Sequence, residues 1–157
     1  MADVDGIYLE AEPGVLICKI HRTAIHPTAG AVARHLRLDG HCIKGKSLSE
    51  AVRTLSSLPL RALEDVKAYP PIHRQPVQPL PYIEIAQGWN CIACEGEFLT
   101  TSLELIGRHV SKAHSKKAGS HSEAHPLWEA CKLQTMFSMS GDRRYFRIES
   151  SDTPDDA

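Results

Sequence analysis

The sequence predicts an α+β protein in which two similar halves are joined by a helical insert and a proline-rich segment. The main observation is a pattern of cysteines and histidines that occurs twice, with corresponding positions 73 or 74 residues apart. Each copy begins with a short β segment and continues into a helical segment. The third observation is a pair of strand-like segments near the C-terminus, which predicts a β-hairpin.

The repeated pattern has the spacing of a metal site. Each copy contains four potential ligands: Cys18, His21, His35 and His41 in the first, and Cys91, Cys94, His109 and His114 in the second. Thiolates and imidazoles at this spacing suit tetrahedral Zn²⁺, with two ligands from a knuckle and two from one helix turn further on. We therefore expect two structural zinc ions. The second copy is the more specific signal, because it combines a Cys-x2-Cys pair with a helical histidine pair.

The first copy departs from the usual pattern, because His21 stands where a second cysteine is expected. His26 and Cys42 are nearby alternative ligands, and the alternative to a metal site is a degenerate finger held together by apolar contacts alone. Both copies supply the apolar pair that forms the small core of a ββα finger: Ile25 and Val32 in the first, Phe98 and Ile106 in the second.

The first half is expected to contain a short strand and a helix. Residues 1–13 are expected to form a flexible N-terminus, and residues 14–20 a β segment that leads into the first knuckle. The helix is expected over residues 28–38, with Thr28 as a plausible N-cap and Gly40 as its terminator.

The insert that follows is expected to form two short helices. Ser47 and Glu50 match a capping box, in which the two side chains would cap the first helix. The second helix is expected over residues 59–68, with Pro59 at its start because proline is tolerated in a first helical turn.

The rest of the chain is expected to contain a connector, the second half and a hairpin. Five prolines within residues 70–81 predict a semi-rigid spacer. A polar loop is expected over residues 115–126, and two strands are expected around the turn Ser140–Asp142. The resulting organisation is a domain over residues 14–148 with a first finger-like half (14–46), a helical insert (47–69), a connector (70–87), a second finger-like half (88–118), a short helix with the hairpin (127–148) and a disordered acidic tail (149–157).

Composition limits the class of function. No apolar run is long enough to span a membrane, and the acidic N-terminal residues lack the apolar region of a secretory signal. We expect an intracellular, reducing environment in which the cysteines are metal ligands, with Cys131 as a buried structural thiol. Four protein ligands would close each metal site, and no H-E-x-x-H motif is present, so we expect no enzymatic activity.

Basic residues gather near both histidine pairs, although the formal net charge of the chain is −1. Eight of them are candidates for phosphate contacts: Arg34, Arg37, Lys44, Lys46, Arg108, Lys112, Lys116 and Lys117. They favour DNA binding through the backbone, which salt would weaken. The alternatives are docking of a protein through exposed apolar residues such as Leu105, and formation of a homodimer.

Base-by-base readout is not expected. In a DNA-reading finger the residues at helix positions −1, 3 and 6 face the bases. These positions hold Thr28, Ala31 and Arg34 in the first copy and Ser102, Leu105 and Arg108 in the second. Ala31 and Leu105 offer no hydrogen bond to a base, and the two copies lack the short linker of tandem fingers.

The order of the motifs resembles a known family. The segments LICKIHRTAIHP, ARHLRLDGH, GWNCIACEGEF and GRHVSKAH are followed by a closing stretch that contains Gln134, Thr135, Phe137, Tyr145, Phe146 and Arg147. Over roughly residues 14–148 this order resembles the fungal zinc-finger-like domain named for the D protein of the orsellinic acid biosynthesis cluster. The resemblance implies one integrated domain with two finger-like halves. It also implies a nuclear, DNA-associated setting and kinship with modules of larger proteins, some linked to helicases or mobile elements.

Overall fold

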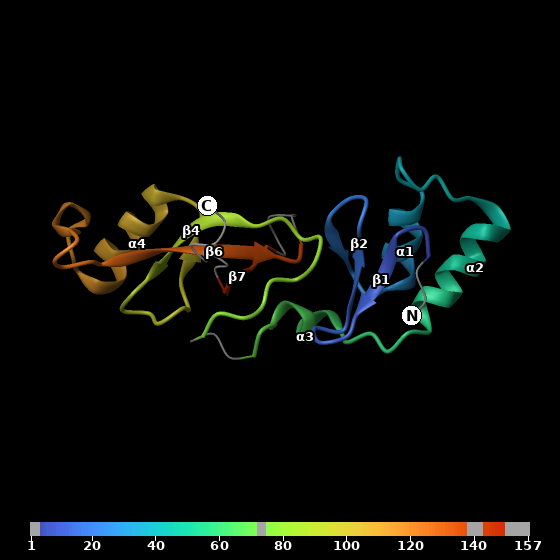
Figure 1. Cartoon of the computed structure of the whole chain (residues 1–157), viewed down its shortest axis with the longest axis horizontal. Coiled ribbons are helices and arrows are strands. Elements are labelled where there is room, and N and C mark those ends of the chain that lie inside the picture. Colours follow the sequence, from blue (N-terminus) through green and yellow to red (C-terminus); the bar gives the residue numbers. More distant parts are fainter. Residues whose placement is uncertain (1–3, 72–74, 138–142, 150–157) are drawn as a thin grey trace, which may run out of the picture. The chain divides into compact units, whose positions relative to one another are not determined.

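The computed structural model of the protein describes residues 4–71, 75–137 and 143–149, and it confirms the α+β class (Figure 1). The chain divides into two compact units, each assembled from separate segments. The first unit comprises Met1–Tyr69, Pro81–Glu84 and Met136–Arg144, and the second comprises Pro70–Leu80, Ile85–Thr135 and Tyr145–Ala157. The single domain expected over residues 14–148 stays a prediction.

The first unit contains a three-stranded antiparallel sheet of β1 (Ile7–Glu10), β2 (Val15–Cys18) and β3 (Thr23–Ile25). Three helices follow: α1 (Ala29–Leu36), α2 (Gly45–Ser56) and α3 (Leu63–Lys67). One core cluster joins apolar residues of β1, β2 and β3 to those of α1 and α2, including Leu16, Leu36 and Leu55. Because side chains alternate across a strand, this cluster covers only one face of the sheet.

The second unit contains a four-stranded sheet in the order β5-β4-β6-β7 and one long helix. Its elements are β4 (Ala86–Cys91), β5 (Leu99–Thr100), α4 (Leu103–His114), the 3-10 turn η1 (Ala118–Ser120), β6 (Trp128–Thr135) and β7 (Tyr145–Ile148). Helix α4 packs on β4 through Ile106 and Val110, which are buried against Cys91. A side chain at Gly88 would collide with Leu133 and with the Thr100 carbonyl, so the centre of this sheet requires glycine.

Helix α1 begins where the sequence predicts. Thr28 is its N-cap, and the Thr28 hydroxyl accepts a hydrogen bond of 3.2 Å from the amide of Ala31. The helix ends at Leu36, before Gly40, which lies in the following loop with a φ of +99°.

Helix α2 starts earlier than expected, so the predicted capping box is wrong. The N-cap is Lys44, with no side-chain hydrogen bond, and Ser47 lies inside the first turn. Burial of Leu48 and Leu55 in the core of the first unit sets the extent of this helix instead.

Three further expectations need correction. Residues 7–10, which we expected within a flexible N-terminus, form β1 and pair with β2. The helix expected over residues 59–68 is reduced to α3, because the amide of Arg61 binds the Gly14 carbonyl at 2.9 Å and holds the chain outside a helix.

The short helix expected at the start of residues 127–148 is not formed, and residues 128–133 belong to strand β6. This segment is rich in helix-forming residues, but pairing with both β4 and β7 overrides that preference. The C-terminal hairpin of β6 and β7 is confirmed, and its predicted turn at Ser140–Asp142 lies outside the described residues. No helix in the described part of the chain is both long and apolar enough to cross a membrane.

Candidate metal centres

The structure brings the eight predicted metal ligands together in two groups of four. Within each group the candidate ligand atoms lie within 4.8 Å of one another. The first group belongs to the first unit and contains Cys18, His21, His35 and His41; the second belongs to the second unit and contains Cys91, Cys94, His109 and His114. Each group can therefore hold a metal ion.

The first knuckle is the turn between β2 and β3. Cys18 is the last residue of β2, and its carbonyl accepts a hydrogen bond of 2.9 Å from the amide of Arg22. Arg22 adopts the left-handed conformation, with a φ of +55°. This tight turn places the amide of His21 3.3 Å from the Cys18 sulfur and brings the two side chains to the same side.

The other two ligands of the first group come from α1 and the loop after it. His35 lies in the last turn of α1, as expected, but His41 follows the helix and does not belong to it. Two successive turns, in which the amide of Leu38 binds the His35 carbonyl and the amide of His41 binds the Leu38 carbonyl, return the chain to the site. The gap between His35 and His41 is one residue longer than that between His109 and His114, and this loop accommodates the extra residue.

The alternative ligands for the first group lie outside it. Cys42 directly follows His41, has a φ of +50° and is exposed. His26 instead packs edge-on against Phe137, with ring centroids 4.5 Å apart. Neither is part of the group that the described residues form.

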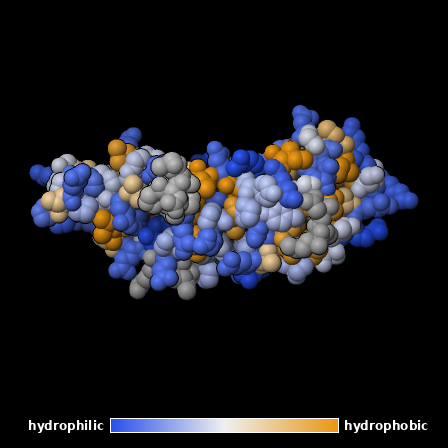
Figure 2. Space-filling model, in the orientation of Figure 1, coloured by the Kyte–Doolittle hydropathy of each residue, from blue (hydrophilic) through white to orange (hydrophobic). Residues whose placement is uncertain are grey.

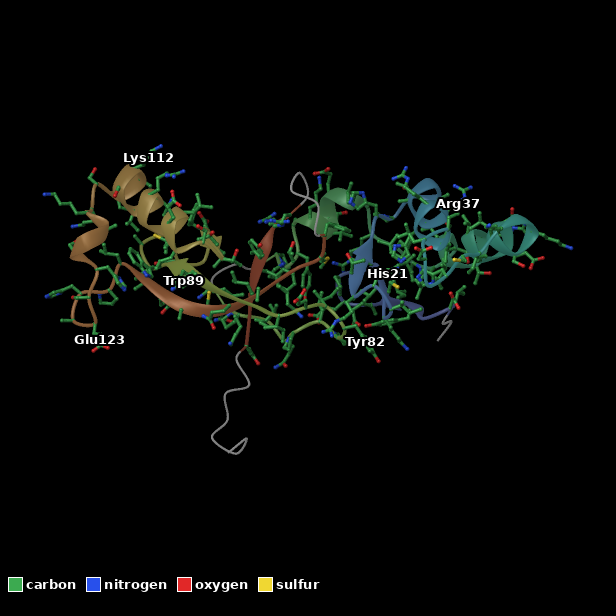
Figure 3. The ribbon with its side chains drawn as sticks, turned by 90° about the horizontal axis from the view of Figure 1, so that it is seen from above. His21, Arg37, Tyr82, Trp89, Lys112 and Glu123 are labelled. Atoms are coloured by element: carbon green, nitrogen blue, oxygen red, sulfur yellow. The ribbon has the colours of Figure 1, made fainter. Side chains whose placement is uncertain are left out.

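Outer hydrogen bonds orient two of the three histidines in the first group, His21 and His41. Figure 3 labels the first of them. His21 Nε2 lies 2.8 Å from the Asp39 carbonyl, and His41 Nδ1 lies 2.7 Å from a carboxylate oxygen of Asp5. Both oxygens can only accept, so these ring nitrogens must carry the proton. The opposite nitrogens then present lone pairs beside the Cys18 sulfur, at 3.4 Å for His21 and 3.2 Å for His41.

His35 completes the first group as a neutral imidazole. Its Nε2 is buried and has no hydrogen-bond partner among the described residues, which is costly unless a metal accepts its lone pair. Burial, together with the neighbouring His21 and His41, lowers the pKa of His35 to about 4. The neutral ring is the form that binds metals.

The second knuckle follows β4. Cys91 is the last residue of that strand, and its carbonyl accepts a hydrogen bond of 3.2 Å from the amide of Cys94. Glu95, the residue after the knuckle, has a φ of +52° and is left-handed like Arg22 at the corresponding place in the first unit. Burial, together with the neighbouring Cys91, raises the pKa of the Cys94 thiol to about 11. A bound cation would lower it.

Both histidines of the second group lie on α4, as the sequence predicts. His114 is the last helical residue, and Ser115 ends the helix with a φ of +54°. His114 Nε2 lies 3.3 Å from the sulfurs of both Cys91 and Cys94, and His109 Nε2 lies 3.3 Å from that of Cys94. The Phe98 ring stacks on His109 with centroids 3.7 Å apart and fixes the plane of the imidazole.

The geometry of both groups fits a tetrahedral ion. A tetrahedron with metal–ligand lengths of about 2.0–2.3 Å has edges of about 3.3–3.8 Å. The sulfur-to-nitrogen distances given above lie at the short end of this range, at 3.3–3.4 Å, except for the Cys18–His41 distance of 3.2 Å just below it. Ligand sets of thiolate and imidazole suit Zn²⁺, and four protein ligands are typical of closed, structural sites.

All eight basic residues predicted to contact phosphates are exposed. Four lie on or between α1 and α2, and the other four lie on or just after α4, where Figure 3 shows Lys112. Arg108 forms an ion pair of 2.8 Å with Glu104 on the same helix. The hydroxyls of Thr28 and Ser102, at helix position −1 of the two copies, cap α1 and α4.

Sequence reasoning missed the groups that orient the ligands. Asp5 lies 36 positions from His41 in a segment expected to be flexible, so no local pattern could have indicated it. The Asp39 carbonyl is a backbone group, which the identity of its side chain does not predict. Phe98 was recognised as a core residue, but its stacking on His109 depends on the fold.

Comparison with known protein families gives a match that covers both Cys/His groups. The model of a protein family, described as Orsellinic acid/F9775 biosynthesis cluster protein D, matches residues 6–115. This range includes all eight residues of the two groups. No curated protein and no solved structure matches the chain.

Proposed function

This chain belongs to the family of the orsellinic acid/F9775 biosynthesis cluster protein D, and we propose that it is a zinc-stabilised, non-enzymatic module that binds DNA in the nucleus. The observation that carries the proposal is the geometry of the two Cys/His groups, each of which gathers four ligand atoms of the kind that zinc prefers. In each unit the metal would hold a helix against a sheet, and exposed cations lie on or beside that helix.

Four protein ligands leave no open coordination position for a substrate or a reactive water, which supports a structural metal. The exposed basic residues around α1 and α4 would contact phosphates without reading bases. Figure 2 shows mostly hydrophilic residues on the visible face, with apolar residues between them. Backbone contacts of this kind depend on salt, since bound phosphates release counterions.

A gel-shift series with a mixed-sequence duplex tests this proposal. We expect binding at low salt that weakens steeply towards physiological salt. Reversing the charge of Arg34, Arg37, Arg108 and Lys112 together should remove the shift, because their contacts with the phosphates are lost. Loss of a single contact should reduce the steepness of log K against log salt by about 0.9. Arg53→Glu is the matched control, since Arg53 is exposed on α2 but outside the proposed set. Absence of a shift at low salt would refute DNA binding.

Docking of a protein is the second candidate function, and one surface favours it. Leu103 and Leu105 on α4 are 53% and 44% exposed. Leu103 also lines a groove of about 520 Å³ together with Gly107, Ala118 and Trp128. Under this hypothesis Leu103→Ser and Leu105→Ser abolish capture of a partner and leave the gel shift intact. A homodimer formed through this surface would instead appear as a doubled mass in solution, lost in the same variants.

A further inference from the structure

An aromatic–basic cluster lies on the first unit, apart from the eight basic residues discussed above. We define it as Tyr8, Lys19, Arg22 and Tyr82. The two tyrosine rings meet edge to face, with centroids 6.0 Å apart and an interplanar angle of 73°. The Lys19 ammonium lies 5.4 Å from the Tyr8 centroid and 5.5 Å from the Tyr82 centroid, so it interacts with both rings.

The sheet and the first knuckle together build this cluster. Ile7 and Leu9 of β1 belong to the core cluster shared with α1 and α2, so Tyr8 between them faces the other side of the sheet. Lys19 and Arg22 belong to the turn that joins Cys18 to β3. The metal-binding turn therefore also determines where these two cations lie.

Tyr82 is held in an unfavourable conformation at the surface (Figure 3). Its φ is +67°, in the left-handed region that disfavours side chains with a Cβ, and the residue is 47% exposed. Arg22 Nε donates a hydrogen bond of 3.0 Å to the Tyr82 carbonyl and helps to maintain this backbone. Strain of this kind is concentrated at functional sites.

Packing alone does not account for Tyr82. The next residue, Ile83, is 4% exposed and supplies the buried apolar contact of this segment. Nearly half of Tyr82 remains in contact with solvent, and an ammonium and a guanidinium lie beside it. An exposed aromatic ring next to cations is the combination with which proteins bind unpaired nucleotides, because the ring stacks on a base while the cations contact the phosphates.

We propose that the aromatic–basic cluster binds single-stranded nucleic acid, with a base stacked on Tyr82 and the adjoining phosphates on Lys19 and Arg22. The ligand is a single strand, because bases in a duplex stack on one another and cannot offer a face to Tyr82. This inference shares the class of ligand with the proposed function but uses a different surface and a different contact.

The test is fluorescence anisotropy with a labelled mixed-sequence single strand and with the same sequence as a duplex, on the full chain. We expect Tyr82→Ala to weaken binding of the single strand at least about fivefold and to leave binding of the duplex unchanged. Tyr82→Trp should retain the affinity, and its added tryptophan fluorescence should be quenched by the single strand. Ile85→Ala is the control, because Ile85 is 52% exposed and lies outside the cluster and both Cys/His groups.

The outcomes separate this inference from the proposed function. Unchanged binding of the single strand by Tyr82→Ala, absence of quenching in Tyr82→Trp, or equally good competition by polyglutamate would overturn the inference. If charge reversal at Arg34, Arg37, Arg108 and Lys112 still abolishes binding of the duplex, the proposed function would remain supported in that case. Binding of the single strand that depends on Tyr82, without any duplex shift, would support the inference and refute the helix-based proposal.

Discussion

The two units place their ligands with the same succession of elements but fix them by different means. In both, a strand ends in a knuckle, a second strand follows, and a helix supplies the third ligand. In both, the residue after the second ligand and the residue after the fourth have positive φ angles: Arg22 and Cys42 in the first unit, Glu95 and Ser115 in the second. The turn after each of these ligands is thus repeated, although the fourth ligand follows α1 in the first unit and ends α4 in the second.

What differs is the support around each group. In the first unit His41 and His21 donate hydrogen bonds to the Asp5 carboxylate and the Asp39 carbonyl, and a cluster of ten buried residues includes the ligand Cys18. In the second unit Phe98 stacks on His109, and the cluster beneath α4 contains three buried residues. From this difference we expect a bound metal to contribute more of the stability around the helix in the second unit than in the first.

Removal of the metal is expected to have the largest effect and to separate the units. Structural zinc contributes about 10–16 kcal/mol in finger peptides, which exceeds the stability of most small domains. After chelation we expect the amides of α4 to lose their protection against hydrogen exchange, while α1 and α2 keep part of theirs because of the larger core. Equal loss of amide protection in both units would contradict the expected difference in their dependence on the metal.

Single substitutions extend the same test. Native mass spectrometry should find two ions in the parent protein and one in Cys18→Ser or Cys94→Ser, with the remaining ion in the other unit. Cys131→Ser is the control, since Cys131 lies on β6 outside both groups and should leave two ions bound. A variant of one group that loses both ions would mean that the groups do not bind independently.

Asp5 provides the next largest effect. Its carboxylate orients His41, and loss of such an outer hydrogen bond commonly lowers metal affinity by about 10- to 100-fold. We expect Asp5→Ala to lower the metal affinity of the first group by this amount and to leave that of the second group unchanged. Competition with a chelator measures both affinities. Asp39→Ala should have little effect, because His21 binds the backbone carbonyl of that residue. Similar losses in both variants would argue against the assigned contacts.

The smallest expected effect concerns the helix caps. Thr28→Ala and Ser102→Ala each remove a hydroxyl that accepts a hydrogen bond from the first turn of its helix, at a cost of about 1 kcal/mol. If the second unit has the smaller core around its helix, Ser102→Ala should increase exchange of the α4 amides more than Thr28→Ala does for α1. The serine replacement Thr28→Ser keeps the hydroxyl and should be nearly neutral.

The sequence predicted those features that depend on local spacing. The membership of both Cys/His groups, the N-cap at Thr28 and the buried pair Ile25 and Val32 follow from distances along the chain. The first part of strand β6, residues 128–133, was wrongly predicted as helix, because pairing with β4 and β7 decides its conformation against its own helical preference. Asp5 was missed for a related reason, since its partner His41 is remote in sequence.

Histidine in place of cysteine at position 21 has an electrostatic consequence. With zinc bound as proposed, Cys91 and Cys94 neutralise the ion in the second unit, whereas Cys18 alone leaves about one unit of positive charge in the first. The Asp5 carboxylate, 2.7 Å from His41, is the nearest counter-charge identified at that centre, and its side chain is 44% exposed, so solvent screens part of its effect. The filled first centre would then be a fixed cation that attracts phosphate without an additional lysine or arginine.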